Sequence, residues 1–179
     1  SEQGYMCAQT KVAYAYQTGR GLTRDAATAA KWYPAAAEQG EVVAQYNLSQ
    51  MYARGIGVPK DTAKCLEWCT KAAQQGYASA QNNLGFLYWA GSGVPQDYDA
   101  AIRWYTLAAQ QGVAAAQFNL GIMYMRGLGV EQDEAVAAAW FADAAKQGFT
   151  QAQFNLGVMH QEGRGVPMDV AKAVELYEQ

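Results

Sequence analysis

A 36-residue repeat runs through the chain and constrains its fold more than any other feature. Four clear copies start at Ala44, Ala80, Ala116 and Ala152, and a weaker copy starts at Ala8. We count positions within a repeat from this alanine as position 0. Asp stands at position 17 in all five copies, so the register does not drift. Tandem units of this length are typical of solenoids, in which each unit packs only against its neighbours.

The alanines divide the chain into repeats. Residues 1–7 match the end of a repeat, because Glu2-Gln3-Gly4 recurs as Glu38-Gln39-Gly40. The five repeats that follow occupy residues 8–43, 44–79, 80–115, 116–151 and 152–179. The last one lacks its Gly-terminated end, and neither end has the polar capping helix that solenoids need. We therefore expect a single solenoid domain that is a fragment of a longer array.

Each repeat predicts two α-helices. In the third repeat Ala80, Leu84 and Leu87 lie on one face at 100° per residue, which indicates a first helix with a buried stripe. A Gly-x-Gly-Val-Pro loop then ends this helix. Asp97, at position 17, predicts the N-cap of the second helix, and Gly112 predicts its end.

Two recurring residue types indicate how the helices pack. Gly at position 5 in the last three repeats predicts a close approach of the two helices, which outweighs its helix-propensity cost of about 1 kcal/mol. Trp stands at position 24 in the first four repeats, and we expect these tryptophans to be the main core residues. On that basis Trp104→Ala costs about 3–5 kcal/mol. The far side of the second helix is polar and is expected to be exposed.

The pattern A-x-x-x-L-G-x-x-Y-x-x-G-x-G-V-x-x-D, followed by W-Y-x-x-A-A-x-Q-G, resembles the Sel-1-like repeat family, which is related to the tetratricopeptide repeats. The resemblance spans residues 8–179. It implies an all-α fold, a right-handed α-α superhelix whose first helices line the concave side. It also implies an adaptor role in assembling other proteins. Many bacterial members are periplasmic or exported, whereas the unpaired thiols of this chain favour the cytoplasm, so both locations stay open.

The first helix carries a second face at positions 2, 6 and 9, between about 180° and 240° on the helical wheel. We call it the variable face, because its residues differ between repeats while the core positions hold. A surface that fits an identical neighbour should repeat, so this one is predicted to form a concave groove for a protein or peptide. The alternative is packing between first helices of adjacent repeats. From the second to the fifth repeat the face comprises Tyr46, Gln50, Ala53, Asn82, Phe86, Trp89, Phe118, Ile122, Met125, Phe154, Val158 and Gln161.

Asparagines at position 3 form a ladder beside the variable face. An amide offers both a donor and an acceptor, so the row could pair with the backbone of an extended peptide. Alternatively, each asparagine satisfies a helix end or loop carbonyl of the adjoining repeat. Arg54 and Arg126 could attract acidic groups. The predicted partner-binding set is Tyr46, Asn47, Gln50, Arg54, Asn83, Phe86, Trp89, Phe118, Asn119, Ile122, Met125, Arg126, Phe154, Asn155 and Val158.

Composition excludes several classes of function. A formal net charge of −3 and a pI near 5.1 provide no basic footprint for nucleic acid. No apolar run approaches the ~18 residues of a membrane-spanning helix, so membrane insertion is not expected. We expect no cofactor, and a partner that is another protein or a peptide.

Catalysis and metal binding find little support in the sequence. The single histidine, His160, takes the place of a repeated tyrosine and is expected to be partly buried. Cys65 and Cys69 lie one helical turn apart, about 5–6 Å between Cβ atoms, which is too far for an easy disulfide. Both are expected to be small core residues. Cys7 is the third cysteine, and no metal site is expected. The cysteine-rich bacterial branch of the family has a regular cysteine pair in each repeat, and this chain does not. The penicillin-related activity of that branch is therefore not expected of this chain. A small-molecule enzyme of that type is the alternative to a non-enzymatic scaffold.

Overall fold

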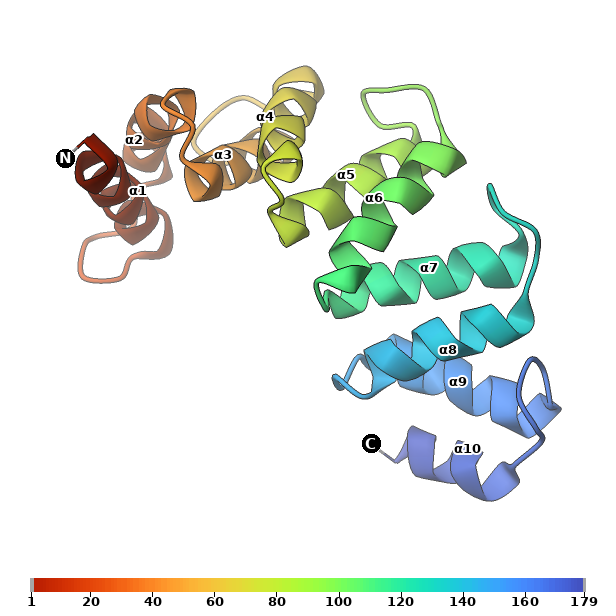
Figure 1. Cartoon of the computed structure of the whole chain (residues 1–179). Coiled ribbons are helices and arrows are strands. Elements are labelled where there is room, and N and C mark those ends of the chain that lie inside the picture. Colours follow the sequence, from red (N-terminus) through yellow and green to blue (C-terminus); the bar gives the residue numbers. More distant parts are fainter. Residues whose placement is uncertain (1, 179) are drawn as a thin grey trace. The chain divides into compact units, whose positions relative to one another are not determined.

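The computed structural model describes residues 2–178, with side chains from residue 7 onward, and within this range the chain forms ten α-helices and no strand (Figure 1). Each repeat supplies two helices, which confirms the predicted all-α fold of tandem helical hairpins. The helices are α1 (Glu2–Thr18), α2 (Ala26–Glu38), α3 (Val42–Arg54), α4 (Thr62–Gln74), α5 (Ala78–Ala90), α6 (Tyr98–Gln110), α7 (Ala114–Arg126), α8 (Glu134–Ala145), α9 (Thr150–Glu162) and α10 (Val170–Tyr177).

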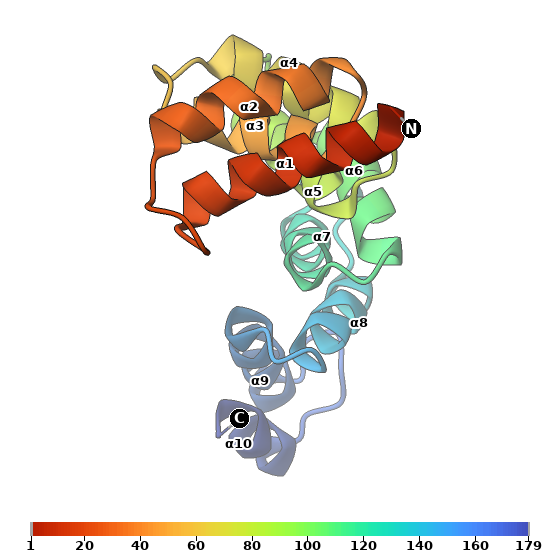
Figure 2. The ribbon, with the colours of Figure 1, turned by 90° about the vertical axis from the view of Figure 1, so that its left-hand side faces the viewer.

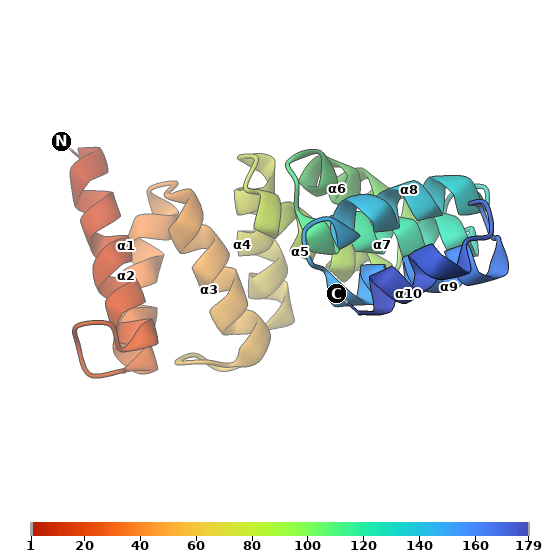
Figure 3. The same ribbon diagram turned by 90° about the horizontal axis from the view of Figure 1, so that it is seen from below.

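The chain divides into two compact units. The first comprises the residues up to Leu87 together with Ser92–Val94, and the second comprises Tyr88–Gly91 together with the residues from Pro95 onward. In the first unit α2 packs against α1 and α3, and α3 packs against α4 (Figure 2). In the second unit each helix from α6 to α10 packs against the next, and α8, α9 and α10 lie alongside one another (Figure 3).

Aspartate at position 17 starts every second helix. Asp133, for example, has an extended backbone, and its Oδ1 accepts a hydrogen bond of 2.9 Å from the amide of Val136. Asp25 accepts from both the amide and the hydroxyl of Thr28, and these hydrogen bonds lower the pKa of its carboxyl group. The same cap occurs at the start of α4, α6 and α10, which confirms the prediction from spacing.

The two glycines of each Gly-x-Gly loop have different tasks. The first ends the first helix in a left-handed conformation, as Gly163 does at φ +68°. The second lies directly on the preceding hairpin at positive φ. A Cβ atom at Gly57 would overlap the carbonyl oxygen of Ala26, and one at Gly165 would overlap that of Glu134. The motif therefore serves the packing of one repeat on the next.

The main core residue of the second helix is at position 25, not at position 24. Tyr33 and Phe141 are 0% exposed and Tyr105 is 2% exposed, whereas Trp32 is 37% exposed and the other three tryptophans are only partly buried. The prediction that the tryptophans form the main core was wrong. Adjacent helical positions point about 100° apart, so only one of the two faces the first helix of its own hairpin.

Glycine at position 5 lets this aromatic ring approach the first helix. A Cβ atom at Gly121 would lie 2.5 Å from Cε1 of Phe141, and one at Gly157 would overlap the ring of Tyr177. In each pair, the glycine and the ring belong to the two helices of one hairpin. The predicted close approach is confirmed, because a side chain at these positions would displace the ring.

Glutamine at position 1 forms buried cross-links that the sequence interpretation missed. Gln45 is 4% exposed, and its Nε2 donates to the carbonyl oxygen of Ala37 at 3.0 Å. Its Oε1 accepts from Nε2 of Gln75 at 2.7 Å, and Gln147 donates in the same way to Gln117 at 2.8 Å. Buried amides need such partners. The strict Ala-Gln recurrence at positions 0 and 1 was the available signal.

Candidate functional site

The predicted partner-binding residues have unequal exposure. Arg54, Phe86, Arg126 and Phe154 are exposed, with exposed fractions of 50% for Phe86 and 58% for Phe154. The other eleven are partly buried. They are Tyr46, Asn47, Gln50, Asn83, Trp89, Phe118, Asn119, Ile122, Met125, Asn155 and Val158.

Part of the variable face packs against neighbouring helices. Phe118 lies with its ring centroid 5.7 Å from that of Phe141 and 5.2 Å from that of Phe149. Ile122 and Met125 contact the same buried cluster. For these three residues of α7, packing against the helices that follow accounts for at least part of the apolar surface.

Two members of the asparagine ladder link adjacent repeats. Asn83 donates from Nδ2 to the hydroxyl of Tyr46 over 3.4 Å, and the amide of Asn47 is hydrogen-bonded to the hydroxyl of Tyr33. Burial is the main reason that the pKa of each tyrosine is raised. Both asparagines therefore contact the adjoining repeat, but through tyrosine hydroxyls and not through the helix ends or loop carbonyls that were expected.

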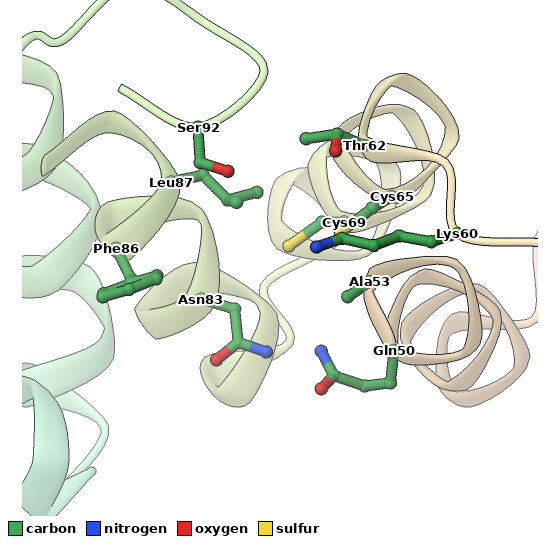
Figure 4. A pocket seen from close by; sticks show the side chains of 10 residues that line it. All are labelled: Gln50, Ala53, Lys60, Thr62, Cys65, Cys69, Asn83, Phe86, Leu87 and Ser92. Atoms are coloured by element: carbon green, nitrogen blue, oxygen red, sulfur yellow. The ribbon is translucent and has the colours of Figure 1, made fainter. Parts of the chain in front are cut away.

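A cavity of about 300 Å³ in the first unit brings three of the predicted residues together (Figure 4). Gln50 comes from α3, whereas Asn83 and Phe86 come from α5. Figure 4 shows Asn83 and Phe86 on one side and Gln50 on the other, with the two cysteines on α4. The other lining residues are Ala53, Lys60, Thr62, Cys65, Cys69, Leu87 and Ser92.

Two buried, uncharged thiols, those of Cys65 and Cys69, line the inner end of the cavity. Cys65 is 5% exposed and Cys69 is 1% exposed. Burial raises the pKa of both thiols, and that of Cys69 reaches about 12. Cys69 donates weakly from Sγ to the carbonyl oxygen of Ala80 at 3.4 Å. The prediction that Cys65 and Cys69 are small core residues is confirmed, whereas Cys7 is exposed.

A second cavity, of about 460 Å³, lies among α8, α9 and α10 in the second unit. Its floor is rich in alanine, and Lys146, Lys172 and His160 are the polar residues that line it. The lining contains no hydroxyl, thiol or carboxylate group that could act as a nucleophile beside the histidine. His160 is partly buried, as predicted, and its Nδ1 lies 3.3 Å from the carbonyl oxygen of Pro167.

Within residues 2–178, no group of three or more His, Cys, Asp and Glu residues is arranged to hold a metal ion. Within the same range, no helix is both long enough and apolar enough to cross a lipid bilayer.

The repeat pattern matches a known protein family over nearly the whole chain. The family model described as Sel1 repeat matches residues 8–41, 42–77, 78–113, 114–149 and 150–179. A search among curated proteins gives no significant match.

Two solved bacterial structures are similar over nearly all of this chain. One is c5321, a protective antigen of uropathogenic Escherichia coli with an SLR fold, at 40% identity and a TM-score of 0.94. The match covers 99% of this chain but only 38% of that one. The other is a Sel1 repeat protein from Oxalobacter formigenes, at 34% identity and a TM-score of 0.92, with coverage of 97% and 69%.

Proposed function

Because the chain belongs to the Sel1 repeat family, we propose that it is a non-enzymatic interaction module that binds a peptide or protein segment on the variable face of its first helices. Members of this family are generally protein-interaction scaffolds. Repeats of this kind present many similar helices, so one chain can offer a different side chain at each copy of the same position.

The observation that carries this proposal is the exposure of aromatic rings on the variable face. Phe86 and Phe154 both stand on first helices and expose half or more of their surface. Aromatic side chains supply much of the binding energy at protein interfaces. The second helices expose ion pairs such as Lys71–Glu67 in α4, together with single apolar side chains such as Leu107.

Selection of binders from a random peptide library, displayed against the whole chain, tests the proposal. We expect selected peptides to lose about fivefold or more in affinity to Phe86→Ala and to Phe154→Ala. Leu107→Ala is the matched control, because Leu107 is an exposed apolar residue (43%) on a second helix. Isothermal titration calorimetry measures each affinity.

Two results would contradict the proposal. One is a library that yields no saturable binder. The other is a set of peptides whose affinity falls as much with Leu107→Ala as with the two phenylalanine variants, because the binding surface would then not be the variable face.

A further inference from the structure

The second repeat departs from the others at the centre of its hairpin. Position 25 holds an aromatic residue in the other four repeats, including Tyr33 and Tyr177, but Cys69 in the second. Position 5, which is Gly or Ala elsewhere, is Ser49. Its side chain is fully buried, and its hydroxyl donates to the carbonyl oxygen of Tyr46 at 2.7 Å. Two small residues therefore face each other where the other hairpins place a ring.

Two tyrosines show where that ring reaches. The hydroxyl of Tyr33 donates to Oε1 of Gln17, at position 9 of its own first helix, over 2.6 Å. It is also hydrogen-bonded to Asn47, at position 3 of the next first helix. The hydroxyl of Tyr177 likewise donates to Oε1 of Gln161, again at position 9, over 3.1 Å. The ring thus extends from position 25 toward positions 9 and 3.

The cavity of the second repeat occupies the corresponding space. Position 9 of this repeat is Ala53 and position 3 of the next is Asn83, and both line the cavity together with Cys69 (Figure 4). Its volume of about 300 Å³ is ample for one aromatic ring, since an apolar cavity of about 150 Å³ holds benzene. By its lining positions, the cavity therefore corresponds to the space that the ring of Tyr33 occupies in the first repeat.

We propose that this cavity binds a tyrosine side chain of a partner peptide, which takes the place of the ring that the second repeat lacks. The inference rests on the proposed interaction function and assigns the anchor residue of the partner. Thioether and thiol sulfur make favourable contacts with aromatic rings, so the floor of Cys65 and Cys69 suits a ring. The ring of Phe86 and the side chain of Leu87 add apolar walls.

Polar groups at the cavity define the rest of the partner. The amides of Gln50 and Asn83 can hydrogen-bond the phenol hydroxyl, as Asn47 does for Tyr33. Lys60 carries the only charge among the ten lining residues. An acidic residue beside the tyrosine therefore complements the site.

The first test uses 4-methylphenol, which is the tyrosine side chain as a free molecule. Titrated into the native protein and followed by NMR, it is expected to shift the methyl signals of Ala53 and Leu87 saturably. Toluene, which lacks the hydroxyl, is expected to bind severalfold more weakly. Shifts centred on the alanine-rich cavity of α8–α10, or no saturable shift at all, would overturn the proposal.

The second test fills the cavity with a tyrosine side chain of the protein itself. The double variant Ser49→Gly/Cys69→Tyr installs the glycine and tyrosine pair that packs in the fifth repeat as Gly157 and Tyr177. It is expected to remain folded by circular dichroism and to bind 4-methylphenol at least about tenfold more weakly than the native protein. Unchanged binding by the folded variant would refute the assignment. If the variant does not fold, the NMR mapping on the native protein still decides.

A peptide arm separates this inference from the proposed function. Peptides selected on the native chain are expected to contain tyrosine, and to lose at least about tenfold in affinity both when it is replaced by alanine and when the cavity is filled. Peptides that bind the variable face but are insensitive to filling would overturn the inference and leave the function standing. Binding of 4-methylphenol with no peptide binder would overturn the function and, with it, the assigned partner.

Discussion

Replacing adjacent residues of α2 separates the two candidate core positions of the second helix. Tyr33 is 0% exposed and Trp32 is 37% exposed, so the two substitutions remove aromatic side chains from different environments. We expect Tyr33→Ala to destabilise the protein far more than Trp32→Ala, although tryptophan is the larger residue.

The magnitudes follow from the buried area. An aromatic side chain buries about 200 Å², which at about 25 cal/mol per Å² is worth about 5 kcal/mol when burial is complete. Truncation of Tyr33 should therefore cost about 4–5 kcal/mol. Trp32 keeps roughly two thirds of that burial, or about 3 kcal/mol. Residual burial in the unfolded chain and the higher helix propensity of alanine reduce both values, to about 4 kcal/mol for Tyr33 and about 2 kcal/mol for Trp32.

Urea unfolding followed by circular dichroism at 222 nm measures both values. Tyr33→Phe is the control for the hydroxyl group, which donates to Gln17 over 2.6 Å, and its expected cost is about 1 kcal/mol. A cost of Trp32→Ala equal to or greater than that of Tyr33→Ala would refute the assignment of position 25 as the core position.

Other predictions concern the loops, the caps and the thiols. Gly165→Ala should cost at least about 2 kcal/mol of unfolding free energy, because it combines positive φ with overlap on the preceding hairpin. Gly163→Ala, at similar φ but with more space around the added methyl group, should cost about 1 kcal/mol. Equal unfolding midpoints for the two variants would disprove the close contact at Gly165. Asp133→Ala should cost about 1 kcal/mol in urea unfolding through loss of the N-cap, and Asp133→Asn should recover most of it. At pH 8 a thiol reagent should modify Cys7 rapidly and Cys69 only on unfolding, and equal rates would contradict the burial of Cys69. Because the pKa of Cys69 is raised to about 12 in the folded state, the contribution of its protonated thiol to the free energy of unfolding is complete below pH 9 and is lost as the pH rises from about 9 to 12. The decrease in unfolding free energy over this pH range should be smaller in Cys69→Ala.

The helices and their ends could be predicted because local chemistry determines them. Aspartate caps, Gly-x-Gly loops and the 100° periodicity all act within a few residues, and the structure confirms each of them. The choice between positions 24 and 25 could not be made in this way. Both positions lie on the apolar stripe, and only the first helix of the same hairpin, brought close by Gly121 or its equivalents, selects position 25.

The candidate site was visible only in part. Residues at positions 2, 3 and 6 could be assigned to one side of the first helix, which placed Gln50, Asn83 and Phe86 on the predicted binding side. The cavity between them depends on a ring that is missing from another helix, and its extent depends on how far such a ring reaches in other repeats. The paired departures Ser49 and Cys69 were the sequence signal, but their meaning required the contacts of Gly121 with Phe141.

The most direct test of a tyrosine anchor in the second repeat is an intermolecular NOE experiment with a selected tyrosine peptide and the native protein. We expect NOEs from the tyrosine ring protons to the methyl groups of Ala53 and Leu87, and we expect these NOEs to disappear in Ser49→Gly/Cys69→Tyr. NOEs from the ring to Ala142 and Leu176, which line the other cavity, would contradict it.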